Sequence, residues 1–128
     1  ATEAVVAMRL HLISWPGLAD IGNRVYNRKA PNGATAPYVV YQRISAARGY
    51  THQGSDRAPR IRVQLVLWDT TPSRLSQLGD ALVDALEAMS DGVTATIETV
   101  FDREDAVKLP NGDTLEAIQV DAFLSYHE

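Results

Sequence analysis

The three histidines are the residues of this chain best suited to acid–base chemistry or metal binding near neutral pH. His11, His52 and His127 are far apart in the sequence, and no pair has the spacing of a local metal-binding motif. His52 and Asp56 stand close together in a polar segment and could in principle form an acid–base pair. Such a pair is far more often solvated than catalytic, because an irregular segment does not hold the geometry that catalysis needs. We therefore expect no catalytic site there.

Metal and cofactor chemistry also lacks a recognisable motif. The chain has no cysteine, which excludes disulfides and thiolate ligands. The acidic stretch Asp102-Arg103-Glu104-Asp105 could suggest a cation site, but Arg103 interrupts it and a charged bend between strands is the commoner meaning. Phosphate-binding loops, dinucleotide fingerprints and nucleophile elbows are missing. We expect no catalytic residue, no metal and no cofactor, and we interpret the protein as a non-enzyme.

Charge is distributed unevenly along the chain, although the net charge is only -4, with 16 acidic and 12 basic residues. The basic residues gather between positions 24 and 62: Arg24, Arg28, Lys29, Arg43, Arg48, Arg57, Arg60 and Arg62. The acids gather later: Asp80, Asp84, Glu87, Asp91, Glu98, Asp102, Glu104 and Asp105. This balance argues against a nucleic-acid coat protein. The uneven distribution permits one positive and one negative side of the molecule, which would suit head-to-tail contacts between identical subunits. The alternative is that these charges are placed by chance on solvated faces.

Two amphipathic helices are predicted. Residues 2–13 form the first, with Val5, Met8 and Leu12 on one face, and Trp15-Pro16-Gly17 ends it. The second begins at Thr71-Pro72, a favoured N-cap and first-turn pair. Its apolar stripe consists of Leu75, Leu78, Leu82, Ala85, Leu86 and Met89.

Four strands are predicted over residues 38–46, 60–69, 93–101 and 115–126, with a brief fifth at Val25 and Tyr26. Strict alternation from 60 to 69 places Ile61, Val63, Leu65 and Leu67 on one face, which belongs in the core. Residues 109–114 carry a strong turn signal. The order of elements predicts one α+β domain over 1–128. It has a mostly antiparallel four- to five-stranded sheet, two helices packed on it and a long β-hairpin loop.

That loop runs from Ala47 to Pro59 and is nearly all polar, with Tyr50 as its one sizeable apolar anchor. It cannot bury enough surface to offset an ordering entropy of ~1–2 kcal/mol per residue. We expect it to be mobile in a free monomer and to become ordered against a partner. A loose hairpin tip without a partner is the alternative.

One stretch resembles a known family. Ala36-Pro37-Tyr38-Val39-Val40-Tyr41-Gln42-Arg43-Ile44-Ser45 is similar to the signature of the phage tail-completion family, the tail terminators and tail-to-head joining proteins of long-tailed phages. The strand 60–69, which ends in Trp68-Asp69, resembles the second strand of that family, and the helix 75–86 resembles the helix after it. Upstream, Asn23-Arg24-Val25-Tyr26 and Ala30-Pro31 also fit. The likeness covers residues 10 to 89, and the C-terminal hairpin agrees only in pattern.

The resemblance implies a structural virion protein, assembled in the bacterial host cytoplasm and located in the tail or neck. It implies a homo-oligomeric ring, usually a hexamer, that caps the head-proximal end of the tail tube and ends tube polymerisation. The implied partners are other copies, the tail tube protein and the head–tail connector or stopper protein. No membrane and no sequence-specific nucleic acid is implied, although DNA can pass through the ring.

A ring requires a heterologous contact, in which two different patches of identical subunits meet. We expect its residues to be Arg48, Tyr50, His52, Arg57, Arg60, Asp102, Glu104 and Asp105. Two alternatives stay open. One is a head-completion or connector subunit of the neck; the other, from a different class, is a small-ligand-binding α+β domain that uses the long loop and the arginine face of strand 60–69.

Overall fold

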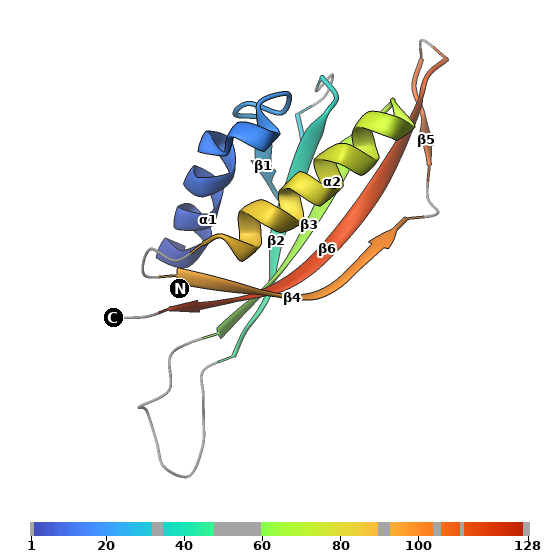
Figure 1. The fold of residues 1–128 in the computed structure, drawn as a ribbon. Helices are drawn as coiled ribbons and strands as arrows, with labels where there is room; N and C mark the ends of the chain where they lie inside the picture. Colours follow the sequence, from blue (N-terminus) through green and yellow to red (C-terminus); the bar gives the residue numbers. More distant parts are fainter. Residues whose placement is uncertain are drawn as a thin grey trace, which may run out of the picture.

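A computed structural model describes residues 2–31, 35–47, 60–89, 93–103, 106–110 and 112–126. Its elements, in chain order, are α1 (Thr2–Ser14), the 3-10 helix η1 (Pro16–Leu18), β1 (Val25–Asn27), β2 (Tyr38–Ala47), β3 (Arg60–Asp69), α2 (Pro72–Glu87), β4 (Val93–Asp102), β5 (Val107–Lys108) and β6 (Thr114–Tyr126). Both predicted helices and all the predicted strands are present (Figure 1). The expected loop over residues 47–59 lies outside the described residues, except for Ala47, which ends β2.

The strands form one six-stranded sheet in the order β1-β2-β3-β6-β4, with β5 paired to β6. Only the β1–β2 pair is parallel; the other pairs of the described sheet are antiparallel. The α+β prediction is therefore confirmed, with one strand more than expected. The addition is the two-residue strand β5, whose Val107 pairs with Leu115 across the predicted turn. Pairs this short leave little trace in a sequence pattern.

Both helices lie on the same face of the sheet (Figure 1). The predicted core residues Ile61, Val63, Leu65 and Leu67 are fully buried there. Their partners on β6 face the same way, because directly paired residues share a face: Ile118, Val120, Ala122 and Leu124. The apolar stripe of α2 closes this core from above, with Leu82 and Leu86 fully buried.

Helix α1 is apolar on more than one side. Met8 and Leu12 are buried against the core, as predicted, and Val5 packs partly buried beside them. Val6 and Leu10 point away from the core and are 50% and 54% exposed. The His11 ring N–H donates a 2.6 Å hydrogen bond to the carbonyl of Ala85, which ties α1 to the last turns of α2. His11 is thus a packing residue in this fold.

Helix α2 begins at a buried carboxylate. Thr71 occupies the N-cap position, as predicted, but its side chain makes no capping bond within the described chain. Asp69, which is 0% exposed, accepts hydrogen bonds from the backbone N–H groups of Thr70 (2.7 Å) and Thr71 (3.3 Å). Arg74 donates to both oxygens of Asp69, each at 2.7 Å. This bidentate pair links the end of β3 to the first turn of α2.

The Asp69 carboxylate is held ionised by these donors. Burial by itself raises the pKa of Asp69, but the hydrogen bonds from Arg74, Thr71 and Thr70 and the charge of Arg74 outweigh it. The resulting pKa lies below the ordinary value. A carboxyl group with a lowered folded-state pKa stabilises the fold above its unfolded pKa, and the stabilisation is lost as the pH falls through the folded value.

Replacing Leu82 by alanine is expected to lower the free energy of unfolding by about 2–5 kcal/mol, because the side chain is fully buried between α2 and the sheet. Urea denaturation measures this. The matched control is Leu10→Ala, which truncates an exposed leucine and should cost less than about 1 kcal/mol in the monomer. Equal losses for the two variants would show that α2 does not face the core in this way.

Replacing Asp69 by asparagine is expected to cost about 2–4 kcal/mol at pH 7, because the amide cannot accept both Arg74 donors. The difference from wild type should shrink as the pH falls below about 4, where the carboxyl of the unfolded chain takes up a proton, and should vanish only once the pH has passed the lower pKa of the folded state. Denaturation curves between pH 7 and pH 3 measure both effects. Asp84→Asn, on the exposed side of α2, is the control. A difference that stays constant with pH would contradict the assignment.

Candidate interaction surfaces

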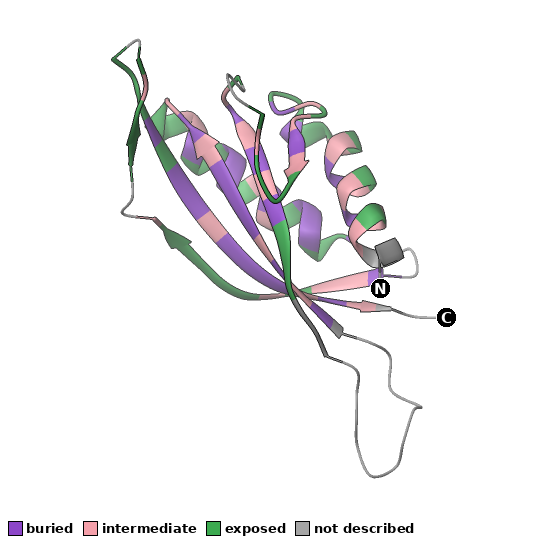
Figure 2. Cartoon of the chain, turned by 180° about the vertical axis from the view of Figure 1, so that it is seen from behind, coloured by how far each residue is buried: buried purple, intermediate pink, exposed green. Residues whose placement is uncertain are grey.

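The face of the sheet opposite the helices is covered by no element in the described part of the chain; in Figure 2 the strands lie in front of the helices. We call it the open face. Alternate residues of each strand project from it, because side chains alternate along a strand. The register places these residues there: Tyr38, Val40, Arg62, Gln64, Val66, Trp68, Thr96, Thr99, Phe101, Ala117, Gln119, Asp121 and Phe123.

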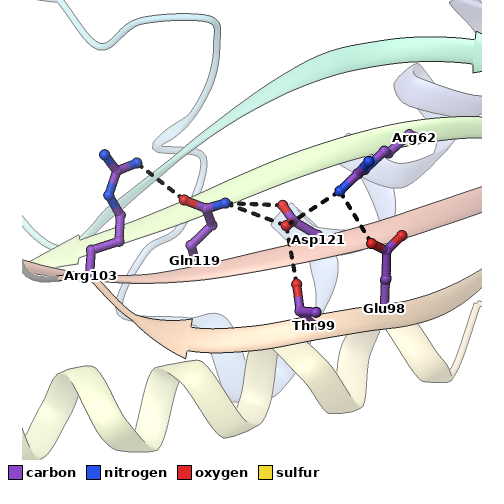
Figure 3. Close-up of polar contacts among 6 residues, drawn as sticks. All are labelled: Arg62, Glu98, Thr99, Arg103, Gln119 and Asp121. Atoms are coloured by element: carbon purple, nitrogen blue, oxygen red, sulfur yellow. Dashed lines mark hydrogen bonds and ion pairs between the residues drawn. The ribbon is translucent and has the colours of Figure 1, made fainter.

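Asp121 is the centre of a polar network on this face (Figure 3). Its carboxylate accepts hydrogen bonds from the Thr99 hydroxyl (3.1 Å) and the Gln119 amide (3.2 Å). The guanidinium of Arg62 lies 3.9 Å from the Asp121 carboxylate and 3.2 Å from that of Glu98. The Asp121 side chain is only 12% exposed, so these contacts replace the water it has lost.

Arg103 extends the network along the open face. It donates a 3.3 Å hydrogen bond to the side-chain oxygen of Gln119. The charges of Arg62 and Arg103 balance those of Glu98 and Asp121. A partner protein could therefore cover this face without leaving an uncompensated charge, which is the costly outcome when ion pairs are buried.

Aromatic side chains gather at the neighbouring end of the open face. The guanidinium carbon of Arg103 lies 5.9 Å from the centre of the Trp68 ring, in a cation–π arrangement. The rings of Tyr26 and Tyr38 are 6.0 Å apart and tilted. Burial, and to a lesser degree the neighbouring Tyr26, raise the pKa of Tyr38, so its hydroxyl is neutral at pH 7. Tyrosine, tryptophan and arginine are enriched at protein interfaces.

The two edges of the sheet carry opposite charge. The basic edge, formed by β1, β2 and their flanks, carries Arg24, Arg28, Lys29 and Arg43. The acidic edge, formed by β4, β5 and the first half of β6, carries Glu98, Asp102, Asp113 and Glu116, which outnumber the basic Arg103 and Lys108 there. All of these side chains except the half-buried Arg24 and Arg103 are exposed. The charge separation seen along the chain is thus also a separation in space for these residues.

The structure places two of the predicted interface residues. Asp102 is exposed at the end of β4, and the backbone of Arg60 begins β3. Arg60 pairs with Ser125 of β6 and Asp102 with Ile118, so they lie near opposite ends of β6 and do not meet within one chain. The remainder lie outside the described residues: Arg48, Tyr50, His52, Arg57, Glu104 and Asp105.

Sequence reasoning missed the network around Asp121. The polar side of the alternating pattern in β3 pointed to Arg62 and Gln64, but nothing in the order of residues pairs Arg62 with Glu98 of another strand. The described residues contain no cluster of histidine, aspartate and glutamate that could hold a metal ion. No described helix is long and apolar enough to span a membrane.

The fold and its surfaces define the class of protein: a small α+β domain suited to contact with other proteins. Its open sheet face carries paired charges, and its two edges carry opposite charges. Comparison with known proteins identifies the family. The sequence model of the family described as tail completion protein gp17 matches residues 6–122. The chain belongs to this family and is a structural protein of the bacteriophage tail, located in the virion.

Solved structures include a chain of similar fold in the virion of a native gene transfer agent particle. It is 18% identical, with a TM-score of 0.57, and the match covers 94% of this chain and 92% of that chain. A crystal structure from Akkermansia muciniphila matches at 15% identity and a TM-score of 0.38, over 68% of this chain and 42% of that chain. No curated protein matches the sequence.

Replacing Asp121 by alanine is expected to lower the free energy of unfolding by about 1–3 kcal/mol, because Thr99 and Gln119 lose a shared acceptor. Glu98→Ala is the matched control on the same face. Its side chain is 36% exposed and has one ion pair, so the loss should stay below about 1 kcal/mol. Chemical denaturation of both variants separates the two outcomes. An equal effect would show that Asp121 does not hold the network together.

Proposed function

We propose that the protein forms a homo-oligomeric ring, with six subunits as the expected number, at the head-proximal end of the phage tail tube. There it ends tube polymerisation and joins the tail to the head connector, and DNA passes through its centre. Membership in the tail completion family supports this role. The similar fold found in a gene transfer agent virion shows that the same architecture occurs in that particle.

The observation that carries the proposal is the opposite charge of the two sheet edges. A ring is built from heterologous contacts, in which one patch of each subunit meets a different patch of the next. The basic edge of one copy and the acidic edge of another are complementary, whereas two like edges repel each other. The contacts expected from the sequence are also heterologous contacts between a basic and an acidic surface. They join Arg48, Tyr50, His52, Arg57 and Arg60 of one copy to Asp102, Glu104 and Asp105 of the next.

Reversal of two charges on one edge tests the ring. Lys29→Glu with Arg43→Glu, on the basic edge, should reduce the ring population in mass photometry and negative-stain microscopy. Each exposed pair contributes only ~0–1 kcal/mol, so two substitutions are needed. Asp102→Lys with Glu116→Lys should have the same effect on the acidic edge. Mixing the two variants should restore mixed assemblies, because the two wild-type edges pair with each other and the two reversed edges are again opposite in charge.

The control is Asp80→Lys, which reverses an exposed charge on α2 away from both edges. It should leave the rings intact. The capping role is tested separately by adding the wild-type protein to polymerising tail tube protein, where tubes should stop growing and carry a ring at one end. A protein that stays monomeric at all concentrations, or rings that leave tube growth unchanged, would contradict the proposal.

A further inference from the structure

Exposed large apolar side chains on the described surface include two groups, with Ile44 of β2 outside both. The α1 patch consists of Val6 and Leu10, one helical turn apart and therefore on the same side of the helix. The β4–β5 patch lies along one edge of the sheet and consists of Val100, Phe101 and Val107, which are 45–47% exposed; Phe101 projects from the open face and Val100 from the opposite face. Large apolar side chains grouped at the surface commonly mark contact sites with other proteins.

The β4–β5 patch follows a single edge of the sheet. Val100 and Phe101 belong to the half of β4 that pairs with Val120 and Gln119 of β6, and Val107 pairs with Leu115 further along β6. Residues from Glu98 to Asp102 are all exposed, because this part of β4 extends beyond the helices. Figure 2 shows it as a continuous exposed segment.

The two patches lie on opposite sides of the molecule. Figures 1 and 2 agree in placing α1 near one lateral end of the sheet and β5 with the second half of β4 at the opposite lateral end. Arg9 fixes the position of α1 at the β1 edge, donating hydrogen bonds to the carbonyl groups of Val25 (3.0 Å) and Asn23 (3.5 Å). Patches on opposite sides cannot meet within one chain but can meet between successive copies.

We propose that the α1 patch of one copy packs against the β4–β5 patch of a second copy. This inference rests on the proposed ring and assigns its apolar contact. The charges around the two patches indicate which surface covers the α1 patch. The α1 patch adjoins the basic edge through Arg9 and β1. The β4–β5 patch lies on the acidic edge, where Glu98, Asp102, Asp113 and Glu116 outnumber Arg103 and Lys108. Bringing the two patches together therefore also brings together opposite charges, whereas a symmetric α1–α1 contact would place basic edges against each other.

In the proposed contact, a helix of one copy packs against a strand edge of the next. The sheets of the two copies are not joined by strand pairing. At the β1 edge the carbonyl group of Val25 already accepts the Arg9 side chain, so α1 covers the edge that a neighbouring strand would need. The edge of β4 has no strand beyond it in the described sheet. It can thus meet the outer side of α1 with its apolar side chains.

Engineered cysteines test the contact directly, because the chain has no cysteine of its own. Under mild oxidation the double variant Leu10→Cys, Phe101→Cys should give a ladder of disulfide-linked multimers on a denaturing non-reducing gel. A mixture of the two single variants should give only dimers. The yield of linked species should exceed by at least fivefold that of the control pair Gln77→Cys, Phe101→Cys, in which Gln77 is exposed on α2. Efficient linkage of Leu10→Cys alone would instead show a symmetric α1–α1 contact and overturn the inference.

Substitutions of the patches provide a second readout. Leu10→Glu and Phe101→Ser should each weaken assembly at least tenfold in mass photometry while circular dichroism stays unchanged. Gln77→Glu is the control for Leu10→Glu, because Gln77 is exposed on α2 and belongs to neither patch and to neither edge of the sheet. Wild-type protein without rings would refute the proposed function itself. Wild-type rings that persist in Leu10→Glu and show no Leu10–Phe101 linkage would refute this inference alone.

Discussion

The ion pair between the buried Asp69 and the partly exposed Arg74 fixes the arrangement on which the rest of the molecule depends. Asp69 ends β3, a central strand of the sheet, and its carboxylate also binds the backbone N–H groups that open α2. The chain therefore turns sharply at this point and α2 returns over the sheet. A carboxylate that is 0% exposed tolerates this position only because four donors satisfy it. The direction of α2 decides which face of the sheet is covered.

Covering one face leaves the other for external contacts. The helices meet a face that is almost entirely aliphatic, whereas the open face combines a paired polar network around Asp121 with aromatic residues near Trp68. Because the network satisfies its own charges, the face is stable in water and can also be covered by another protein. The edges add opposite charges, so a single sheet provides several distinct surfaces for a tail structural protein.

Much of the fold could be predicted from local patterns. The alternation from Ile61 to Leu67 identified the buried side of β3, and the spacing of Leu75, Leu78 and Leu82 identified that of α2. Both signals are strong because burial repeats with the period of the element. The interface was harder to predict, since exposed residues follow no such period. Of the residues named for it, the described structure places Asp102 at an exposed edge and the backbone of Arg60 far from it along β6.

The sequence by itself determined the class of fold, the inward side of each main element and the separation of basic from acidic residues along the chain. Tertiary structure decided which strands became neighbours. It placed β6 between β3 and β4, which brought Arg62 to Glu98 and Asp121. It also set α2 so close to β6 that a Cβ on Gly79 would lie 2.8 Å from Ile118. Such contacts join residues distant in sequence, and their pairing depends on strand order and packing, which no local period encodes.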